Sequence, residues 1–140
     1  MTTQSVLIID DEPDIRELLD ITLSRMGLET HCAANLKEAM RMVEELQPDL
    51  CLTDMRLPDG TGLEIVEHIA EKNYPTPVAV ITAFGDAKTA VQALKSGAYD
   101  YVSKPIELDE LKNLITTGLQ ISDNGNEPSK SVEESTLIGK

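Results

Sequence analysis

Three acidic residues stand at the end of the first apolar run of the chain. The run VLII, residues 6–9, leads directly into Asp10, Asp11 and Glu12. Carboxylates this close repel one another unless water or a cation screens them. Grouped carboxylates suit a hard cation such as Mg²⁺, which keeps several waters and uses few protein ligands. Glu12 is expected to point away from such a site.

Further polar residues stand at the ends of later apolar runs. Asp54 follows LCLT, Thr82 ends VAVIT, and Lys104 follows YVS. With a cation bound, such a group could accept a phosphoryl group, whose oxygens the lysine and the hydroxyl could neutralise or hydrogen-bond. A carboxylate can itself be the nucleophile and form an aspartyl phosphate. Asp54, which is central among these residues, is the natural acceptor.

Each of these residues, taken alone, has an ordinary structural explanation. Asp11 could cap a helix that begins near Pro13, and Asp54 could be a turn residue before MRLPDG. Thr82 could be a strand hydroxyl and Lys104 a solvated charge. In a doubly wound sheet, however, ligands bind outside the carboxyl ends of the strands. The convergence of three acids, one hydroxyl and one lysine on that edge favours a site over coincidence.

Strand-like and helix-like patterns alternate along the chain. Asn35 and Asp86 are expected to cap the second and fourth helices, and Gly27 and Gly97 to end the first and fourth. The apolar runs predict strands at residues 6–9, 30–33, 50–53, 78–82 and 99–102. Strands that are apolar on both faces, each followed by a helix, predict an α/β protein with a parallel sheet wrapped by helices.

The composition limits the partners of the chain. It has 140 residues, with 25 acidic and 12 basic side chains and a net charge of −13. This length fits one domain with a real core, and the charge opposes direct contact with nucleic acid. No apolar run is long enough to span a bilayer, and the start MTTQSV lacks a signal segment. We therefore expect no membrane association and a cytoplasmic location.

The composition changes near residue 120. Residues 121–136 include SDNGNEPSKSVEEST, which is too polar to bury a core and predicts a flexible linker. Residues 137–140, LIGK, turn apolar again. They are either the start of a following domain or a ragged end.

Three segments resemble the receiver domain of two-component response regulators. They are IIDDEPDIRELL, LTDMRLPDGTGLEIV and VITAFGDAKTAVQALKSGAYDYVSKP, and the resemblance covers residues 5–120. The acid pair, the acceptor aspartate, the threonine and the Lys-Pro pair all match in order. The resemblance implies a flavodoxin-like (CheY-like) doubly wound fold, a five-stranded parallel sheet with strand order 2-1-3-4-5.

The resemblance also implies a metal site and a phosphodonor. Asp10, Asp11 and Asp54, with the backbone carbonyl of Arg56, would bind Mg²⁺. Asp54 would take its phosphoryl group from the phosphohistidine of a sensor histidine kinase. No enzymatic activity is expected beyond Mg²⁺-dependent self-phosphorylation and self-dephosphorylation.

The remaining matched residues would bind the phosphoryl group and respond to it. Thr82 and the backbone N–H of Ala83 would bind one of its oxygens, and Lys104 would form an ion pair with it. Tyr101 would move with Thr82, although it could instead be an ordinary core aromatic. Pro105 would follow a cis peptide bond. A homodimer through the fourth helix, the fifth strand and the fifth helix is also expected.

A narrower resemblance concerns the type of regulator. DIRELLDITLSRMGL, LCLTDMRLPDG and AVQALKSGAYDYVSKP are similar to receivers of the NtrC-type sigma-54-dependent activators, and among them to the type IV pilus regulators. That group implies an attached AAA+ ATPase, often opening with a sequence like LIGK, and an attached DNA-binding module. The sequence contains no Walker A motif. The alternative is a free-standing receiver that signals by protein contact alone.

Three other classes fit less well. A haloacid-dehalogenase-type phosphatase would need a second acid two residues after its nucleophile, where this chain has Arg56. A flavodoxin-like redox module would need a phosphate loop rich in hydroxyl groups and glycine, and DDEPD is its electrostatic opposite. A receiver that is never phosphorylated would lack a key residue, and here none is missing.

Overall fold

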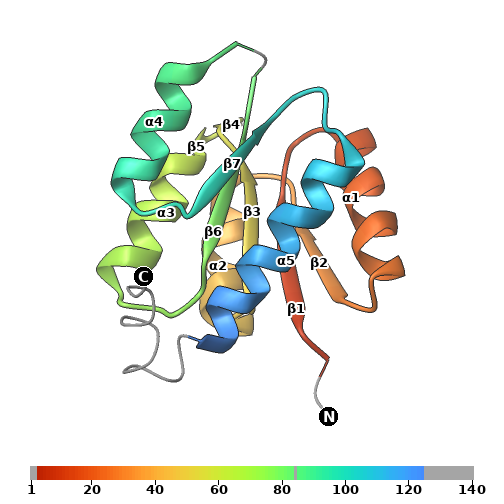
Figure 1. Ribbon diagram of the computed structural model, residues 1–140. Helices are drawn as coiled ribbons and strands as arrows, with labels where there is room; N and C mark the ends of the chain where they lie inside the picture. The colour runs from red at the N-terminus through yellow and green to blue at the C-terminus, as the bar shows by residue number, and fades with distance from the viewer. Residues whose placement is uncertain (1–2, 84, 125–140) are drawn as a thin grey trace, which may run out of the picture.

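Five parallel strands form the central sheet (Figure 1). The computed structural model describes residues 3–83 and 85–124. The strands of the sheet are β1 (Ser5–Ile9), β2 (Glu29–Ala33), β3 (Leu50–Asp54), β6 (Val78–Thr82) and β7 (Asp100–Ser103). Their order is β2-β1-β3-β6-β7, which confirms the predicted order 2-1-3-4-5 with β6 and β7 as the fourth and fifth strands.

The helices begin and end close to the predicted signals. They are α1 (Pro13–Arg25), α2 (Leu36–Leu46), α3 (Gly62–Glu71), α4 (Ala87–Ser96) and α5 (Leu108–Asn124). The Asn35 side chain accepts a hydrogen bond from the first turn of α2, and the Asp86 side chain does the same for α4. Gly27 follows α1 with a φ of 85°, which glycine adopts without a Cβ clash. These predicted caps and stops are confirmed.

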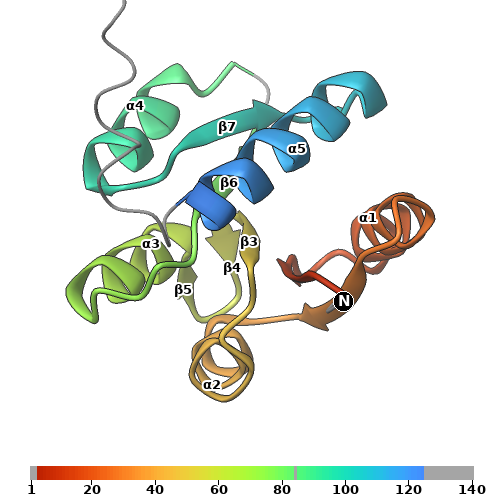
Figure 2. The same cartoon turned by 60° about the horizontal axis from the view of Figure 1, so that its bottom comes forward.

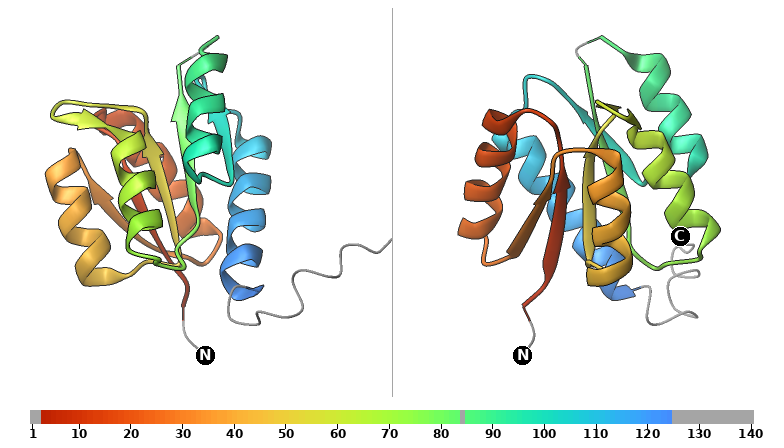
Figure 3. Two further views of the ribbon diagram at one scale, coloured as in Figure 1. Left: turned by 90° about the vertical axis from the view of Figure 1, so that its left-hand side faces the viewer. Right: turned by 180° about the vertical axis from the view of Figure 1, so that it is seen from behind.

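The helices cover both faces of the sheet (Figures 2 and 3). Helices α1 and α5 pack on one face, and α2, α3 and α4 pack on the other. Strand β1 serves both cores, since Val6 and Ile8 face α1 and α5 while Leu7 and Ile9 face the opposite helices. Each such buried side chain contributes about 1.5–3 kcal/mol relative to exposure. This double burial explains why the strand is apolar throughout.

A short hairpin follows β3 and was not predicted. Its strands, β4 (Arg56–Leu57) and β5 (Gly60–Thr61), pair antiparallel around Pro58 and Asp59. The hairpin therefore lies at the carboxyl end of β3, directly after Asp54. It separates the predicted acceptor from α3.

Helix α5 ends later than the predicted domain boundary. It continues from residue 120 to Asn124, which is inside the segment predicted as a linker. The rest of that segment, 125–136, and residues 137–140 lie outside the described residues. Among the helices that the structure describes, none combines the length and apolar character needed to cross a membrane.

Candidate functional site

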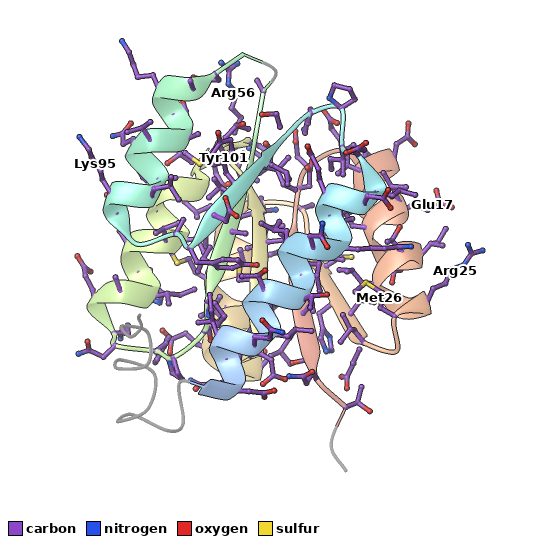
Figure 4. The ribbon with its side chains drawn as sticks, viewed as in Figure 1. Glu17, Arg25, Met26, Arg56, Lys95 and Tyr101 are labelled. Atoms are coloured by element: carbon purple, nitrogen blue, oxygen red, sulfur yellow. The ribbon has the colours of Figure 1, made fainter. Side chains whose placement is uncertain are left out.

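The predicted site residues meet at the carboxyl ends of four strands, an edge that we call the acidic rim. Asp10 follows β1, Asp54 ends β3, Thr82 ends β6 and Lys104 follows β7. Parallel strands bring these ends to one edge of the sheet, as the sequence predicted. In Figure 4, Arg56 lies at this same end of the molecule.

Three carboxylates form the centre of the acidic rim. Oxygens of Asp10, Asp11 and Asp54 lie within 4.8 Å of one another. Asp10 is completely buried and Asp54 is 7% exposed, whereas Asp11 is exposed. The Glu12 backbone N–H donates to Asp10 Oδ1 at 2.9 Å. Asp10 Oδ2, by contrast, is buried without a hydrogen-bond partner among the described residues.

Lys104 compensates part of this negative charge. Its Nζ lies 3.4 Å from Asp54 Oδ2 and 3.6 Å from Asp10 Oδ2. It also lies 3.5 Å from Glu12 Oε1, so the prediction that Glu12 points away from the site is wrong. The reason is electrostatic, because a partly buried ammonium draws the carboxylate that stands beside it at the start of α1. The Lys104 ammonium group thus lies close to three carboxylates.

Burial in the acidic rim disfavours the charged form of its two buried aspartates. Burial raises the pKa of Asp10 from 3.8 to about 6, against the lowering effect of the Glu12 N–H, and the charge of Asp54 raises it further. Burial also raises the pKa of Asp54, although Lys104 partly offsets this. Desolvation lowers the pKa of Lys104, but the three carboxylates outweigh it and hold the pKa above its usual value.

These features fit a bound divalent cation. A buried carboxylate oxygen without a partner is costly, and an oxygen-binding cation satisfies it. The cluster consists of three carboxylates, whose oxygens are ligands that Mg²⁺ prefers. Asp11 gives the group an exposed member, so an entering ion can keep part of its water shell. The residues present therefore fit the metal that the sequence predicted.

The backbone after Asp54 passes very close to the start of α3. The Met55 N–H donates to Ile81 O at 3.1 Å, and the Gly62 N–H donates to Met55 O at 3.0 Å. A Cβ on Gly62 would lie 2.3 Å from the Asp54 carbonyl oxygen, so only glycine allows this approach. The chain around the predicted acceptor is therefore fixed on both sides.

Thr82 and Tyr101 differ strongly in exposure. Thr82 is 1% exposed, and its hydroxyl lies 3.3 Å from Ser103 Oγ and 3.5 Å from Val102 O, both long contacts. Tyr101, on β7, is 39% exposed, so it is not an ordinary core aromatic (Figure 4). The Thr82 hydroxyl is therefore weakly held, and it can turn towards a new partner at small cost.

The Lys104–Pro105 peptide bond is cis.

An open cavity of about 700 Å³ adjoins the acidic rim. Asp54, Arg56, Ala83, Asp86 and Lys104 are among the residues that line it. The cavity brings the exposed surface of the predicted acceptor within reach of a phosphodonor. Its size suits a phosphoryl group with part of the molecule that carries it.

Sequence reasoning missed three contributors to the acidic rim. Glu12 pairs with Lys104, Ser103 contacts Thr82, and Arg16 Nη1 donates to the Asp10 carbonyl oxygen at 2.7 Å. Arg16 fixes the turn between β1 and α1, where Asp10 and Asp11 stand. Its position one turn into α1 was the available signal, since the first turn of a helix faces the preceding strand end.

Comparisons with known proteins agree with this geometry. Residues 6–116 match the response regulator receiver domain family. The chain is 49% identical over 140 residues to the response regulator protein PilR of Pseudomonas aeruginosa, covering 100% of this chain and 31% of that protein. It is 39% identical over 116 residues to the regulatory protein AtoC of Escherichia coli, covering 83% of this chain and 25% of that protein. The chain thus spans about a third or less of the length of these curated relatives.

A solved structure extends the comparison to the fold. The solution structure of the beryllofluoride-activated NtrC4 receiver domain dimer superposes with a TM-score of 0.79 at 32% identity, over 84% of this chain and 98% of that chain. The predicted resemblance to NtrC-type receivers, and to the pilus regulators among them, is confirmed by these similarities.

Proposed function

The chain belongs to the response regulator receiver domain family, whose members are signalling domains and not classical enzymes, and from this premise we propose that it is a phosphoacceptor switch. Asp54 takes a phosphoryl group from the phosphohistidine of a sensor histidine kinase. The observation that carries the proposal is the acidic rim itself. There the Asp54 carboxylate lies near an Asp10 oxygen that has no hydrogen-bond partner among the described residues and near the ammonium of Lys104, beside an open cavity.

The metal site of this proposal comprises Asp10, Asp11, Asp54 and the backbone carbonyl of Arg56. The spacing of the three carboxylates and the Asp10 oxygen without a hydrogen-bond partner among the described residues support a cation at this position. When bound, Mg²⁺ would offset the repulsion between the acids and an incoming phosphoryl group.

The transfer itself needs one nucleophile and a binding site for the transferred group. An oxygen of Asp54 attacks phosphorus as the phosphorus–nitrogen bond of the phosphohistidine breaks, and the electron pair leaves with the imidazole nitrogen. Lys104 then pairs with the phosphoryl group, and the Thr82 hydroxyl and the Ala83 backbone N–H donate to its oxygens. Hydrolysis by water returns Asp54 to its carboxylate. The domain catalyses only its own phosphorylation and dephosphorylation.

The response follows from the position of Thr82 beside β7. When the Thr82 hydroxyl turns towards the phosphoryl group, it leaves its long contacts to Ser103 and Val102, and Tyr101 takes up the vacated space. The surface of α4, β7 and α5 changes with it. The added charge at Asp54 thus shifts the domain between two conformations. We propose a homodimer through this surface, and the dimeric state of the similar NtrC4 receiver supports it.

The wider role rests on the longer relatives. We propose that the chain is the receiver of an NtrC-type sigma-54-dependent activator in the cytoplasm. The receiver begins at residue 5 and ends with α5 at Asn124, a linker extends from there to residue 136, and residues 137–140 are the start of an AAA+ domain. A DNA-binding domain would follow it. The alignment with PilR covers all of this chain and only 31% of that protein. This supports the arrangement over a free-standing receiver.

Phosphorylation by a small donor tests the assignment of the acceptor. The protein is incubated with acetyl phosphate with Mg²⁺ or with a chelator, and the added mass is located by peptide mass spectrometry after borohydride trapping. We expect Mg²⁺-dependent labelling of Asp54 and no labelling of Asp54→Asn. Asp49→Asn, which changes an acid at the opposite end of the sheet, is the matched control and should label normally. Undiminished labelling of Asp54→Asn would overturn the proposal.

A further inference from the structure

Asp59 joins two segments that are distant in the sequence. It stands at the tip of the β4–β5 hairpin, and its carboxylate accepts two hydrogen bonds from the first turn of α2. Asp59 Oδ1 accepts from the Leu36 N–H at 2.7 Å, and Oδ2 accepts from the Lys37 N–H at 3.1 Å. The side chain is exposed, but both oxygens are directed into the helix terminus.

The start of α2 is thus capped by two different residues. Asn35, the local cap, accepts from the Glu38 N–H at 2.8 Å. The first turn of a helix leaves its N–H groups without partners inside the helix, and it favours negative charge. Accordingly, the two backbone N–H groups hold the pKa of Asp59 below its usual value. Asn35 stabilises only the helix, whereas Asp59 also ties the helix to the hairpin.

Packing around the hairpin supports this attachment. Leu57 of β4 and Leu36 of α2 are buried in the same apolar cluster. A Cβ on Gly60 would lie 2.5 Å from Leu36 Cδ2, so the hairpin backbone rests directly on α2. At its other end, the hairpin meets Gly62, which packs against the backbone of Asp54. The hairpin is therefore held at α2 on one side and at the acceptor strand on the other.

We propose that Asp59 is a positioning residue for metal binding, because it fixes the hairpin that carries the Arg56 backbone carbonyl. This inference rests on the proposed function, which assigns that carbonyl to Mg²⁺. Magnesium demands near-ideal octahedral geometry, so a ligand that moves by a fraction of an ångström binds it poorly. Of the two residues of β4, only Leu57 is buried in the apolar cluster, and Arg56 is exposed. Asp59 adds a polar constraint on the hairpin from outside the acidic rim.

The test compares two caps of the same helix. Mg²⁺ affinity is measured by calorimetric titration at constant ionic strength for the wild-type protein, Asp59→Ala and Asn35→Ala, with thermal unfolding of each. Both variants should unfold at lower temperature, because each removes a cap of α2. Asp59→Ala should bind Mg²⁺ about tenfold more weakly, the lower end of the range for residues that support metal ligands. Asn35→Ala should keep the wild-type affinity, because it does not contact the hairpin.

A conservative variant separates positioning from simple loss of stability. Asp59→Asn keeps one acceptor oxygen, so its Mg²⁺ affinity should lie between those of the wild-type protein and Asp59→Ala. This variant replaces Asp59→Ala if the latter does not fold. Wild-type affinity in the Asp59 variants, or an equal loss in Asn35→Ala, overturns the inference while leaving the proposed function intact. A wild-type protein that binds no Mg²⁺ instead refutes the metal site, and the inference fails with it.

Discussion

The two ends of the central sheet treat polar groups in opposite ways. At the amino ends of the strands, Asp49 Oδ2 accepts the Ser5 N–H at 2.8 Å and Thr76 donates to Pro48 O at 2.9 Å. At the carboxyl ends, the buried Asp10 Oδ2 has no hydrogen-bond partner among the described residues. Both ends belong to the same strands, so the fold alone does not require the difference.

The contrast separates stability from function. Buried polar groups are normally paired, because an unpaired one costs about 1–3 kcal/mol. The amino end follows this rule, while the acidic rim departs from it with one lysine among three acids. Such departures are characteristic of sites that await a ligand. The comparison therefore predicts that equivalent substitutions at the two ends have different effects.

The largest effect is expected on metal binding. Asp11→Asn removes one proposed Mg²⁺ ligand and leaves Asp54 in place, so the Mg²⁺ affinity should fall by about 100-fold, which is about 2.7 kcal/mol. Asp49→Asn, at the amino end, should leave the affinity unchanged. Calorimetric titration of both variants measures the difference. If the affinity of Asp11→Asn equals that of the wild-type protein, Asp11 does not bind the metal and its role is confined to the start of α1.

The next effect is on the stability of the metal-free protein. The pKa of Asp10 rises from 3.8 to about 6 on folding. The folded state therefore binds more protons between these pH values, and the free energy of unfolding falls as the pH rises through this window. The shift corresponds to about 3 kcal/mol, which solvent on the open side of the acidic rim reduces to about 2 kcal/mol.

Asp10→Asn should therefore stabilise the metal-free protein by about 2 kcal/mol at pH 7, by removing the charge that burial penalises. Near pH 3, where Asp10 is protonated in both states, the difference should vanish. Urea unfolding in the presence of a chelator, at both pH values, provides the measurement. A destabilised Asp10→Asn at pH 7 would show that burial does not disfavour the charge of Asp10 in the acidic rim.

The sequence predicted the residues of the acidic rim better than their surroundings. Asp10, Asp54, Thr82 and Lys104 could be placed because each ends or follows an apolar strand, and parallel strands end at one edge. The caps of α2 and α4 depend on hydrogen bonds between residues three positions apart, so they too could be predicted. These features are local, or follow from a general rule of sheet topology.

The features that were missed depend on distances between remote segments. Glu12 faces Lys104 because β1 and β7 finish at the same edge, which the local sequence DDEPD does not encode. Asp59 reads as a turn residue after Pro58, and its bonds to α2 arise from residues more than 20 positions earlier. The strands β4 and β5 have two residues each, too few for any periodic pattern.

A third prediction concerns the two-state response at the carboxyl end. Beryllofluoride with Mg²⁺ mimics an acyl phosphate, and we expect it to change amide exchange in α4 and β7, by about 1–2 kcal/mol of coupling free energy. Exchange near Asp49 and Thr76, at the amino end, should stay the same. If the ligand shifts an existing equilibrium, the free protein should already visit the active state at low population. Protection confined to Asp10, Asp11 and Asp54 would contradict the proposed switch.

The smallest effects come from the same substitution made at both ends, threonine to valine. Thr76 is buried and donates a 2.9 Å hydrogen bond to Pro48 O, so Thr76→Val should lower the free energy of unfolding by about 1 kcal/mol. Thr82 is buried more deeply, but its contacts of 3.3 and 3.5 Å are long, so Thr82→Val should change the free energy of unfolding by less than about 0.5 kcal/mol. Urea unfolding of the two variants in parallel measures both values. Equal losses would mean that the Thr82 hydroxyl is already well paired in the resting protein, and turning it towards a phosphoryl group would then cost a full hydrogen bond.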